Sequence, residues 1–408
     1  MNIKHRLIIM NFLQYFIWGS WLISLGAYLG GTLRFTGLQI GSFFATMGIA
    51  SLFMPAVMGI IADRWIPAQK LLGICHIVGA AFLVAAAPQH EYGPLYGLIL
   101  CSVMFYMPTI ALSNSVAYNA LEMKGYDTVK TFPPIRVWGT VGFICAMIAV
   151  DLLGFDSSAG QLYVAAAAAL VLGAYSFTLP PCAVDRTPRR QSWVDSLGLR
   201  AFALFKERKM AIFFIFSMML GMSLQITNAY ANDYLTNFFG NDPLYKGTFG
   251  VEHANILISL SQASETLCIL LIPFFLRRFG IKNVMLISML AWVLRFGLLG
   301  AGNPGGGVWM LILSMIVYGV AFDFFNISGS LYVEKETDPS IRSSAQGVFM
   351  IMTNGFGAFV GSYAAGAVVD SFGWPDSWFV FAGYSLLVAV VFLLVFRYKH
   401  TPETAAAK

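Results

Sequence analysis

The sequence predicts an all-α membrane protein in which twelve transmembrane helices form two bundles of six. Three observations carry this prediction: the composition, the number of long apolar runs and the distribution of positive charge. Of the 408 residues, 58% are hydrophobic and only 11% are charged, and the mean hydropathy is +0.71. Because an average soluble protein has about 25% charged residues, this chain cannot cover a globular surface with charge. The composition therefore excludes a soluble globular protein and a disordered one.

The apolar runs are long enough to cross a membrane, which takes roughly 20 mostly apolar residues for each helix. Charged residues, Gly and Pro separate twelve such runs. They lie at about 7–30, 38–62, 68–88, 94–121, 133–153, 160–181, 210–239, 251–276, 280–301, 307–333, 343–369 and 374–397. The first run is too long for a cleaved signal peptide and is followed directly by another span.

Lys and Arg are concentrated in alternate loops. If the N-terminus is cytoplasmic, the inner segments hold 21 of these residues, and the outer loops hold two, Arg34 and Lys246. Positive charge favours the cytoplasmic side of a membrane. The pattern therefore predicts an even number of spans with both termini in the cytoplasm. The net charge of +5 arises from these loops and does not indicate nucleic-acid binding.

The longest inner segment divides the chain into an N-terminal bundle at 1–181, a cytoplasmic linker at 182–209 and a C-terminal bundle at 210–408. Apolar residues of the linker recur at helical spacing over 193–205, which predicts a helix lying in the membrane interface. An irregular connector is the alternative.

Short basic turns follow spans two and eight, at 59–64 and 275–282, which is a faint internal repeat. These turns, together with two equal halves and a basic central loop, resemble the major facilitator superfamily. The resemblance implies a substrate cavity near the membrane midplane and alternating access by rocking of the two halves.

Four charged residues fall inside predicted spans: Arg136, Glu265, Arg295 and Asp323. A charge at the centre of a span costs roughly 2.5–3.5 kcal/mol on insertion scales. Such residues persist where they pair with one another or face a water-filled cavity. We expect Arg295 to be a structural partner of one of the two acids.

Span five places Arg136, Thr140 and Phe143 on one helix face, at i, i+4 and i+7. That face offers a bidentate donor, a hydroxyl and an aromatic ring to a ligand. Alternatively, Arg136 lies near the inner interface and extends its head group into water.

Spans seven and eight each carry a polar pair at i, i+3: Gln225 with Asn228, and Gln262 with Glu265. Side-chain amides both donate and accept hydrogen bonds, which suits hydroxyls and heterocycle edges. The alternatives are helix–helix hydrogen bonds for the amides and a structural ion pair for Glu265.

Span ten places Tyr318 and Phe322 at i, i+4, with Asp323 bordering the same face. A carboxyl group beside aromatic rings is a plausible proton carrier next to a stacking surface. A purely structural aspartate is the alternative.

The five cysteines and five histidines show no spacing typical of a metal site or a disulfide framework. We expect reduced core thiols, no metal and no cofactor. The spans also show no nucleophile–base pattern, so an enzyme is not expected.

Five segments together resemble the bacterial nucleoside:proton symporter family, which includes nucleoside and xanthosine permeases. They are 18–21, 132–143, 224–228, 278–282 and 318–336, the last being the most specific. The resemblance covers essentially the whole chain. It implies proton-driven uptake of nucleosides such as uridine, adenosine or xanthosine across the bacterial inner membrane, and we expect a monomer in the lipid bilayer.

The resemblance also implies which residues line the nucleoside site. Phe143 and Phe322 would flank the base, and Arg136 would bond a ligand oxygen. The implied site is Arg136, Thr140, Phe143, Gln225, Asn228, Gln262, Glu265, Tyr318, Phe322 and Asp323, with amides bonding the base or ribose. Glu265 and Asp323 would be the acids tied to proton coupling.

The stretch at 229–233 departs from the family pattern, which leaves the outer rim of the site and the base preference open. A symporter of another polar solute, such as a sugar, is the alternative function. A membrane receptor that does not transport is a more remote one.

Overall fold

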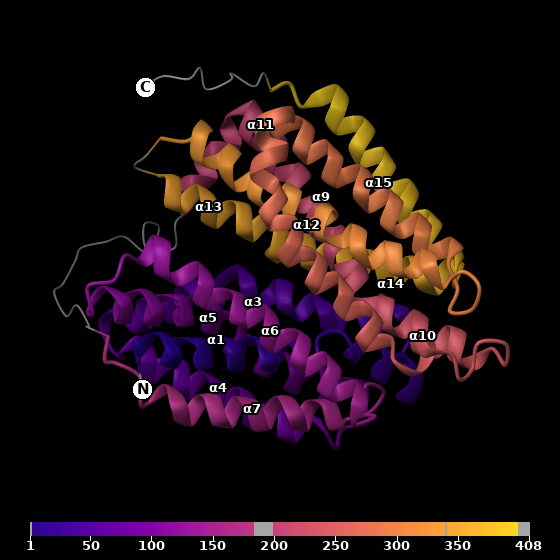
Figure 1. The fold of residues 1–408 in the computed structure, drawn as a ribbon, viewed down its shortest axis with the longest axis horizontal. Helices are drawn as coiled ribbons and strands as arrows, with labels where there is room; N and C mark the ends of the chain where they lie inside the picture. Colours follow the sequence, from indigo (N-terminus) through magenta and orange to yellow (C-terminus); the bar gives the residue numbers. More distant parts are fainter. Residues whose placement is uncertain (1, 183–198, 339–340, 399–408) are drawn as a thin grey trace.

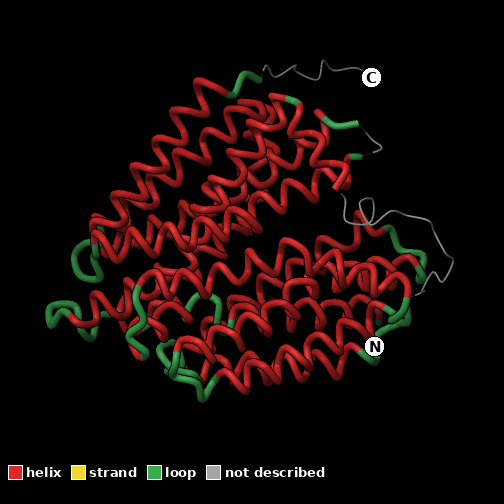
Figure 2. Tube along the Cα trace, turned by 180° about the vertical axis from the view of Figure 1, so that it is seen from behind, coloured by secondary structure: helices red, strands yellow, loops and turns green. Residues whose placement is uncertain are grey.

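The computed structural model describes residues 2–182, 199–338 and 341–398, and all regular structure in these ranges is helical. Figures 1 and 2 show two groups of helices, which follow one another in the sequence: in Figure 1 the first runs from indigo to magenta and the second from pink through orange to yellow. Helices pack mainly within their own group, so the predicted two-part architecture is visible in the packing.

The first group, here the N-terminal bundle, contains six long helices. They are α1 (Ile3–Gly19), α3 (Gly37–Arg64), α4 (Ala68–Ala86), α5 (Tyr92–Glu122), α6 (Thr128–Leu152) and α7 (Gly160–Ser176). The short α2 (Leu25–Ala27) and the π-helix η1 (Tyr28–Thr32) extend α1 toward α3. Apolar residues form the interior of this bundle because every helix has to bury a face against its neighbours.

The second group, the C-terminal bundle, contains longer and more interrupted helices. They are α9 (Arg208–Asp233), η3 (Tyr234–Phe238), η4 (Phe239–Asn241), α10 (Phe249–Glu252), α11 (Ala254–Ala301), α12 (Val308–Glu336), α13 (Arg342–Met350), η5 (Ile351–Gly357), α14 (Ala358–Phe372) and α15 (Asp376–Val395). The interruptions η3 and η5 are π-helical turns, which are often found at functional sites.

In the described ranges, nine helices are long and apolar enough to cross a membrane. One of them, α11, is two helices joined at Gly280, whose φ of 74° breaks the helix. The 17-residue helices α1 and α7 are slightly shorter than the length required of a span. With α11 divided and these two added, the helices coincide with the twelve predicted spans.

The first part of the predicted linker helix, 193–198, lies outside the described residues. The described part, η2 (Leu199–Lys206), is a 3₁₀-helix in which Leu204 is buried. We call the end of the molecule where α7 ends and α9 begins the linker end.

The two bundles are joined by hydrogen bonds at the opposite end, which we call the contact end. Asp370 of α14 accepts the backbone N–H groups of Gly37 and Leu38 at 2.6 and 2.8 Å, and so covers the start of α3. Beside them, the Tyr230 hydroxyl donates to the Gly37 carbonyl at 2.7 Å.

A second link at the contact end joins α6 to the start of α11. His253 Nδ1 lies 2.6 Å from Asp151 Oδ1, and the backbone N–H of Ile256 donates to the other carboxylate oxygen at 3.3 Å. Toward the linker end the two groups of ribbons diverge (Figure 2). The predicted site residues lie between these two ends.

Candidate substrate-binding site

Arg136 is held by an aromatic ring of the same bundle. Its guanidinium carbon lies 3.8 Å from the centre of the Tyr15 ring, a cation–π contact between α6 and α1. Gly139 makes room for this contact, because a Cβ at that position would lie 2.6 Å from Tyr15 Cδ2. Arg136 has no carboxylate of the described residues within 4.0 Å. Its guanidinium is therefore held by the Tyr15 side chain and not by an ion pair within the described residues.

Glu265 of α11 faces Arg136 from the other bundle. The two groups interact electrostatically, and Glu265 also interacts with Tyr15 and with Asp323. In the described residues no ion pair joins Glu265 to either span arginine. Glu265 and Arg136 are therefore a carboxylate and a guanidinium on opposite bundles that interact without forming an ion pair.

Asp323 of α12 is buried at 3% exposure, and its Oδ2 has no hydrogen-bond partner among the described residues. A buried and unpartnered carboxylate oxygen is costly unless it carries a proton or meets a ligand. This finding is compatible with the predicted role of Asp323 as a proton carrier.

The rings of Tyr318 and Phe322 stack along α12, with centroids 5.9 Å apart and planes inclined by 15°. Glu265 and Asp323 both interact electrostatically with the Tyr318 hydroxyl, and the Gln262 side chain lies close to it. The structure thus brings these predicted residues of α11 and α12 together.

The prediction that Arg295 pairs with one of the acids is wrong. Its fully buried guanidinium lies 4.7 Å from the centre of the Tyr318 ring and donates to the Ser314 carbonyl at 2.6 Å. The Ser314 hydroxyl donates back to the Arg295 carbonyl at 3.0 Å. Both partners of the Arg295 guanidinium belong to α12, so a ring and a carbonyl take the place of the expected carboxylate.

The other predicted residues, on α6 and α9, make no described contact with the acidic residues of the predicted site. Gln225 of α9 is buried, and its Oε1 lacks a hydrogen-bond partner among the described residues. Asn228 and Thr140 are half-buried. Phe143 is buried beside α1, where its carbonyl oxygen would lie 2.5 Å from a Cβ on Gly19. No described side-chain interaction connects these four residues to Glu265 or Asp323.

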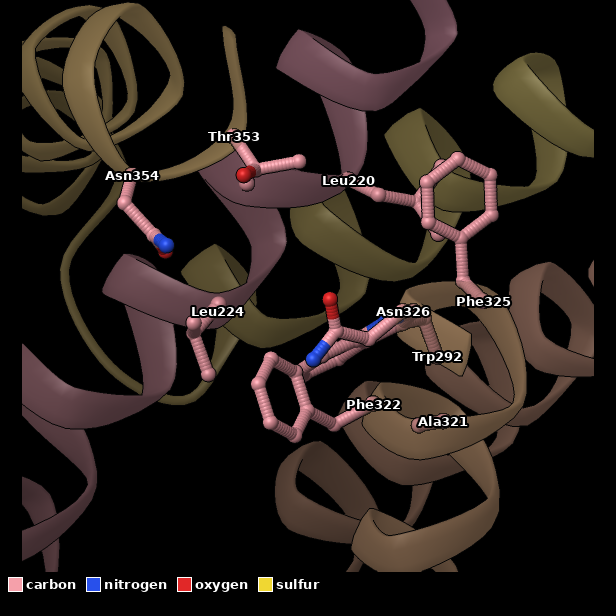
Figure 3. A pocket seen from close by; sticks show the side chains of 10 residues that line it. Leu220, Leu224, Trp292, Ala321, Phe322, Phe325, Asn326, Thr353 and Asn354 are labelled. Carbon is pink, nitrogen blue, oxygen red and sulfur yellow. The ribbon is translucent and has the colours of Figure 1, made fainter. Parts of the chain in front are cut away.

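A cavity lies in the C-terminal bundle beside the predicted residues (Figure 3). Phe322 lines it, as does Leu224, which precedes Gln225. The full lining is Leu220, Gly221, Leu224, Trp292, Ala321, Phe322, Phe325, Asn326, Thr353 and Asn354.

The sequence does not predict three residues that the structure places at or beside the site: Tyr15, Asn326 and Asn354. Nothing distinguishes Tyr15 from the other aromatic residues of the first apolar run. Asn326 could have been found, because it stands four residues after Phe322 and so shares its face. Asn354 lies in the π-helical η5, where ordinary helical spacing does not apply.

Within the described ranges, no three His, Cys, Asp or Glu residues come close enough to hold a metal ion. The predicted site residues supply amides, aromatic rings, a guanidinium and two carboxyl groups. Such a set binds by hydrogen bonding and stacking, and it can carry protons.

Comparisons with known proteins agree with this chemistry. A family model described as "Nucleoside H+ symporter" matches residues 1–401. The nucleoside permease NupG of Escherichia coli (strain K12) is 51% identical over 407 residues, which are 98% of this chain and 97% of that protein. The xanthosine permease of the same organism is 53% identical over 410 residues, or 99% of this chain and 98% of that one.

A crystal structure of NupG superposes with a TM-score of 0.92 at 51% identity and covers 98% of this chain and 100% of that one. The predicted fold class is thereby confirmed, and so is the prediction of a multi-pass membrane transporter rather than an enzyme. The chain belongs to the nucleoside:H⁺ symporter family.

Proposed function

We propose that this protein takes up nucleosides across the bacterial inner membrane, driven by protons that move inward with them. The match of the nucleoside:H⁺ symporter model to residues 1–401 carries this proposal. Both termini and the linker end face the cytoplasm in the proposed orientation, in keeping with the concentration of Lys and Arg in the inner loops. The bundles then expose the site to each side in turn.

The chemistry of the site supports a neutral, flat and polar substrate. Gln225, Asn228 and Gln262 supply amides for the base or ribose, and Phe143 and Phe322 supply rings for the base. Nucleotides are disfavoured, because a phosphate group calls for a cluster of cations.

Arg136 and Glu265 support a simple form of coupling. When Glu265 is ionised, its field attracts the guanidinium from the opposite bundle. A proton on Glu265 removes that attraction and leaves Arg136 free to bond an oxygen of the nucleoside. Substrate and proton therefore favour each other's binding, which symport requires.

Asp323 supplies a second protonatable group close to the first. Its unpartnered Oδ2 is tolerated in the closed protein when the acid is neutral. Opening toward the cytoplasm hydrates the acid, so that proton and nucleoside leave together.

One proton for each neutral nucleoside provides enough driving force for accumulation. A charge that crosses 100 mV contributes roughly 2.3 kcal/mol. At about 1.4 kcal/mol for each tenfold ratio, this corresponds to about fifty-fold accumulation.

The test is uptake of labelled uridine into energised right-side-out membrane vesicles. We expect concentrative uptake that a protonophore abolishes, with competition by adenosine and xanthosine. Competition by lactose but not by nucleosides would transfer the proposal to a sugar. Uptake that is insensitive to the protonophore would contradict proton coupling.

A further inference from the structure

The cavity of Figure 3 contains side-chain amides that the proposed site does not use. Asn326 makes no hydrogen bond to any described residue, and its amide lies next to the ring of Phe322 in the cavity (Figure 3). Asn354 faces the same space from η5, and the contact of its amide within the described structure is with the Met350 thioether at 3.7 Å. Two amides that face one cavity have hydrogen-bonding capacity to offer a ligand.

The cavity lies beyond the proposed site, toward the linker end. Asn326 comes four residues after Phe322 and eight after Tyr318, which is about 6 Å and about 12 Å along α12. On α9, Leu224 likewise lies closer to the linker end than Gln225 does. Phe322 belongs to both places, so one ring can serve a ligand in either position.

The architecture allows η5 to come close to α9 here. A Cβ on Gly221 would lie 2.1 Å from the Thr353 carbonyl oxygen, so only glycine permits this approach. The π-helical turn of η5 presents both Thr353 and Asn354 toward the cavity. A widened turn at this point is typical of a functional position.

The chemistry of the lining selects one class of ligand. No charged side chain lines the cavity. Aromatic side chains of Trp292 and Phe322 offer surfaces for a flat ring, and the two amides can bond the edge of a base. Phosphate-bearing nucleotides and charged solutes do not fit such a lining.

We propose that this cavity is a second nucleoside subsite, through which the substrate passes between the proposed site and the cytoplasm, with Asn326 and Asn354 as its specific contacts. The inference rests on the proposed function. Because Phe322 is shared, a nucleoside occupies the two positions in turn rather than together. The subsite gives the cytoplasm-facing state an affinity for nucleoside that the outward-facing state lacks.

The experiment measures uridine flux in right-side-out and inside-out membrane vesicles, without any proton gradient, for Asn326→Leu and Asn354→Leu. We expect the half-saturation concentration at the cytoplasmic face to rise about fivefold, which corresponds to about 1 kcal/mol, the net value of a typical hydrogen bond. The value at the outer face should change less than twofold.

The maximal rate at the cytoplasmic face should rise together with the half-saturation concentration. Without gradients, the ratio of maximal rate to half-saturation concentration is the same for both directions, so weaker uniform binding at one face raises both quantities there. A variant that merely folds poorly would lose maximal rate at both faces with unchanged half-saturation. Asn283→Leu, on an exposed face of α11, is the matched control.

The outcomes separate this inference from the proposed function. Wild-type protein without saturable uridine flux would refute both. Wild-type flux with unchanged half-saturation at the cytoplasmic face in both variants would refute the subsite alone. A poorly folded Asn326→Leu is replaced by Asn326→Ser, for which a smaller shift in the same direction is expected and an unchanged value is contrary evidence.

Discussion

Gly41 provides a sharp test of how the contact end closes. It lies in α3, where a Cβ would stand 2.2 Å from the Ser362 carbonyl oxygen of α14 and 2.9 Å from the Tyr230 hydroxyl. Ordinary van der Waals contact begins near 3.4 Å. For Gly41→Ala the two helices must therefore separate by about 1.2 Å, the difference between 3.4 and 2.2 Å.

The expected magnitude follows from the general effect of overpacking. Extra methyl groups in a well-packed interface cost typically 1–3 kcal/mol. In Gly41→Ala this penalty applies to the state in which the bundles touch at the contact end. The balance should move toward the state open at that end by about 5- to 150-fold. Gly59→Ala in the same helix is the matched control, because nothing lies within 4 Å of its added Cβ.

Both substitutions raise helix propensity by a similar amount, so their comparison isolates the clash. Pulsed electron paramagnetic resonance between labels at Leu153→Cys and Lys246→Cys, with native cysteines replaced by serine, reports the separation of the bundles at the contact end. We expect Gly41→Ala to lengthen this distance and to slow uridine uptake at least fivefold, and Gly59→Ala to do neither. Equal distances and equal uptake in the two variants would refute the reasoning.

Three further outcomes are expected. Asp323→Asn should abolish accumulation of uridine and leave equilibrating uptake with a protonophore intact; wild-type accumulation would exclude Asp323 from coupling. Tyr15→Leu should raise the half-saturation concentration for uridine by about 2- to 30-fold, because the cation–π contact with Arg136 is lost. Tyr15→Phe keeps the ring and should stay near wild type. Equal shifts in the two variants would show that the cation–π contact does not contribute to binding. Burial and the nearby Asp151 raise the pKa of Asp156, in the loop after α6. An acid whose pKa is raised in the folded state destabilises the fold as pH rises from about 4 toward that raised pKa. In thermal unfolding in detergent, Asp156→Asn should therefore gain stability over wild type as pH rises across this window. A gain at the low-pH side alone would contradict the assignment.

The sequence predicts the helices well because hydrophobic length is a direct requirement of the membrane. The break at Gly280 also follows from the pattern, since a basic turn separates spans eight and nine. The π-helical turn η5 is not visible in the pattern. It lies at a close approach between the bundles, where a Cβ on Gly48 of α3 would stand 2.5 Å from the Gly355 carbonyl oxygen.

The candidate site is predicted where neighbours on one helix face define it, as for Tyr318 and Phe322. Contacts between helices are harder to predict from a single chain. The cation–π partner of Arg136 comes from α1, more than a hundred residues away in the sequence. Arg295 shows the opposite error, because charge balance suggests a carboxylate partner, and the fold supplies a ring and a carbonyl.

The interaction of Asp370 with the start of α3 restricts how the strength of this closure can vary. On one side it uses main-chain N–H groups. Position 37 has to remain glycine, because a Cβ there would lie 2.8 Å from Asp370 Oδ1 and from the Gly366 carbonyl oxygen. At position 38, any residue other than proline supplies the same donor. Adjustment of the bond, whether by natural variation or by engineering, is therefore confined to α14, where a single carboxylate can be lengthened, neutralised or removed.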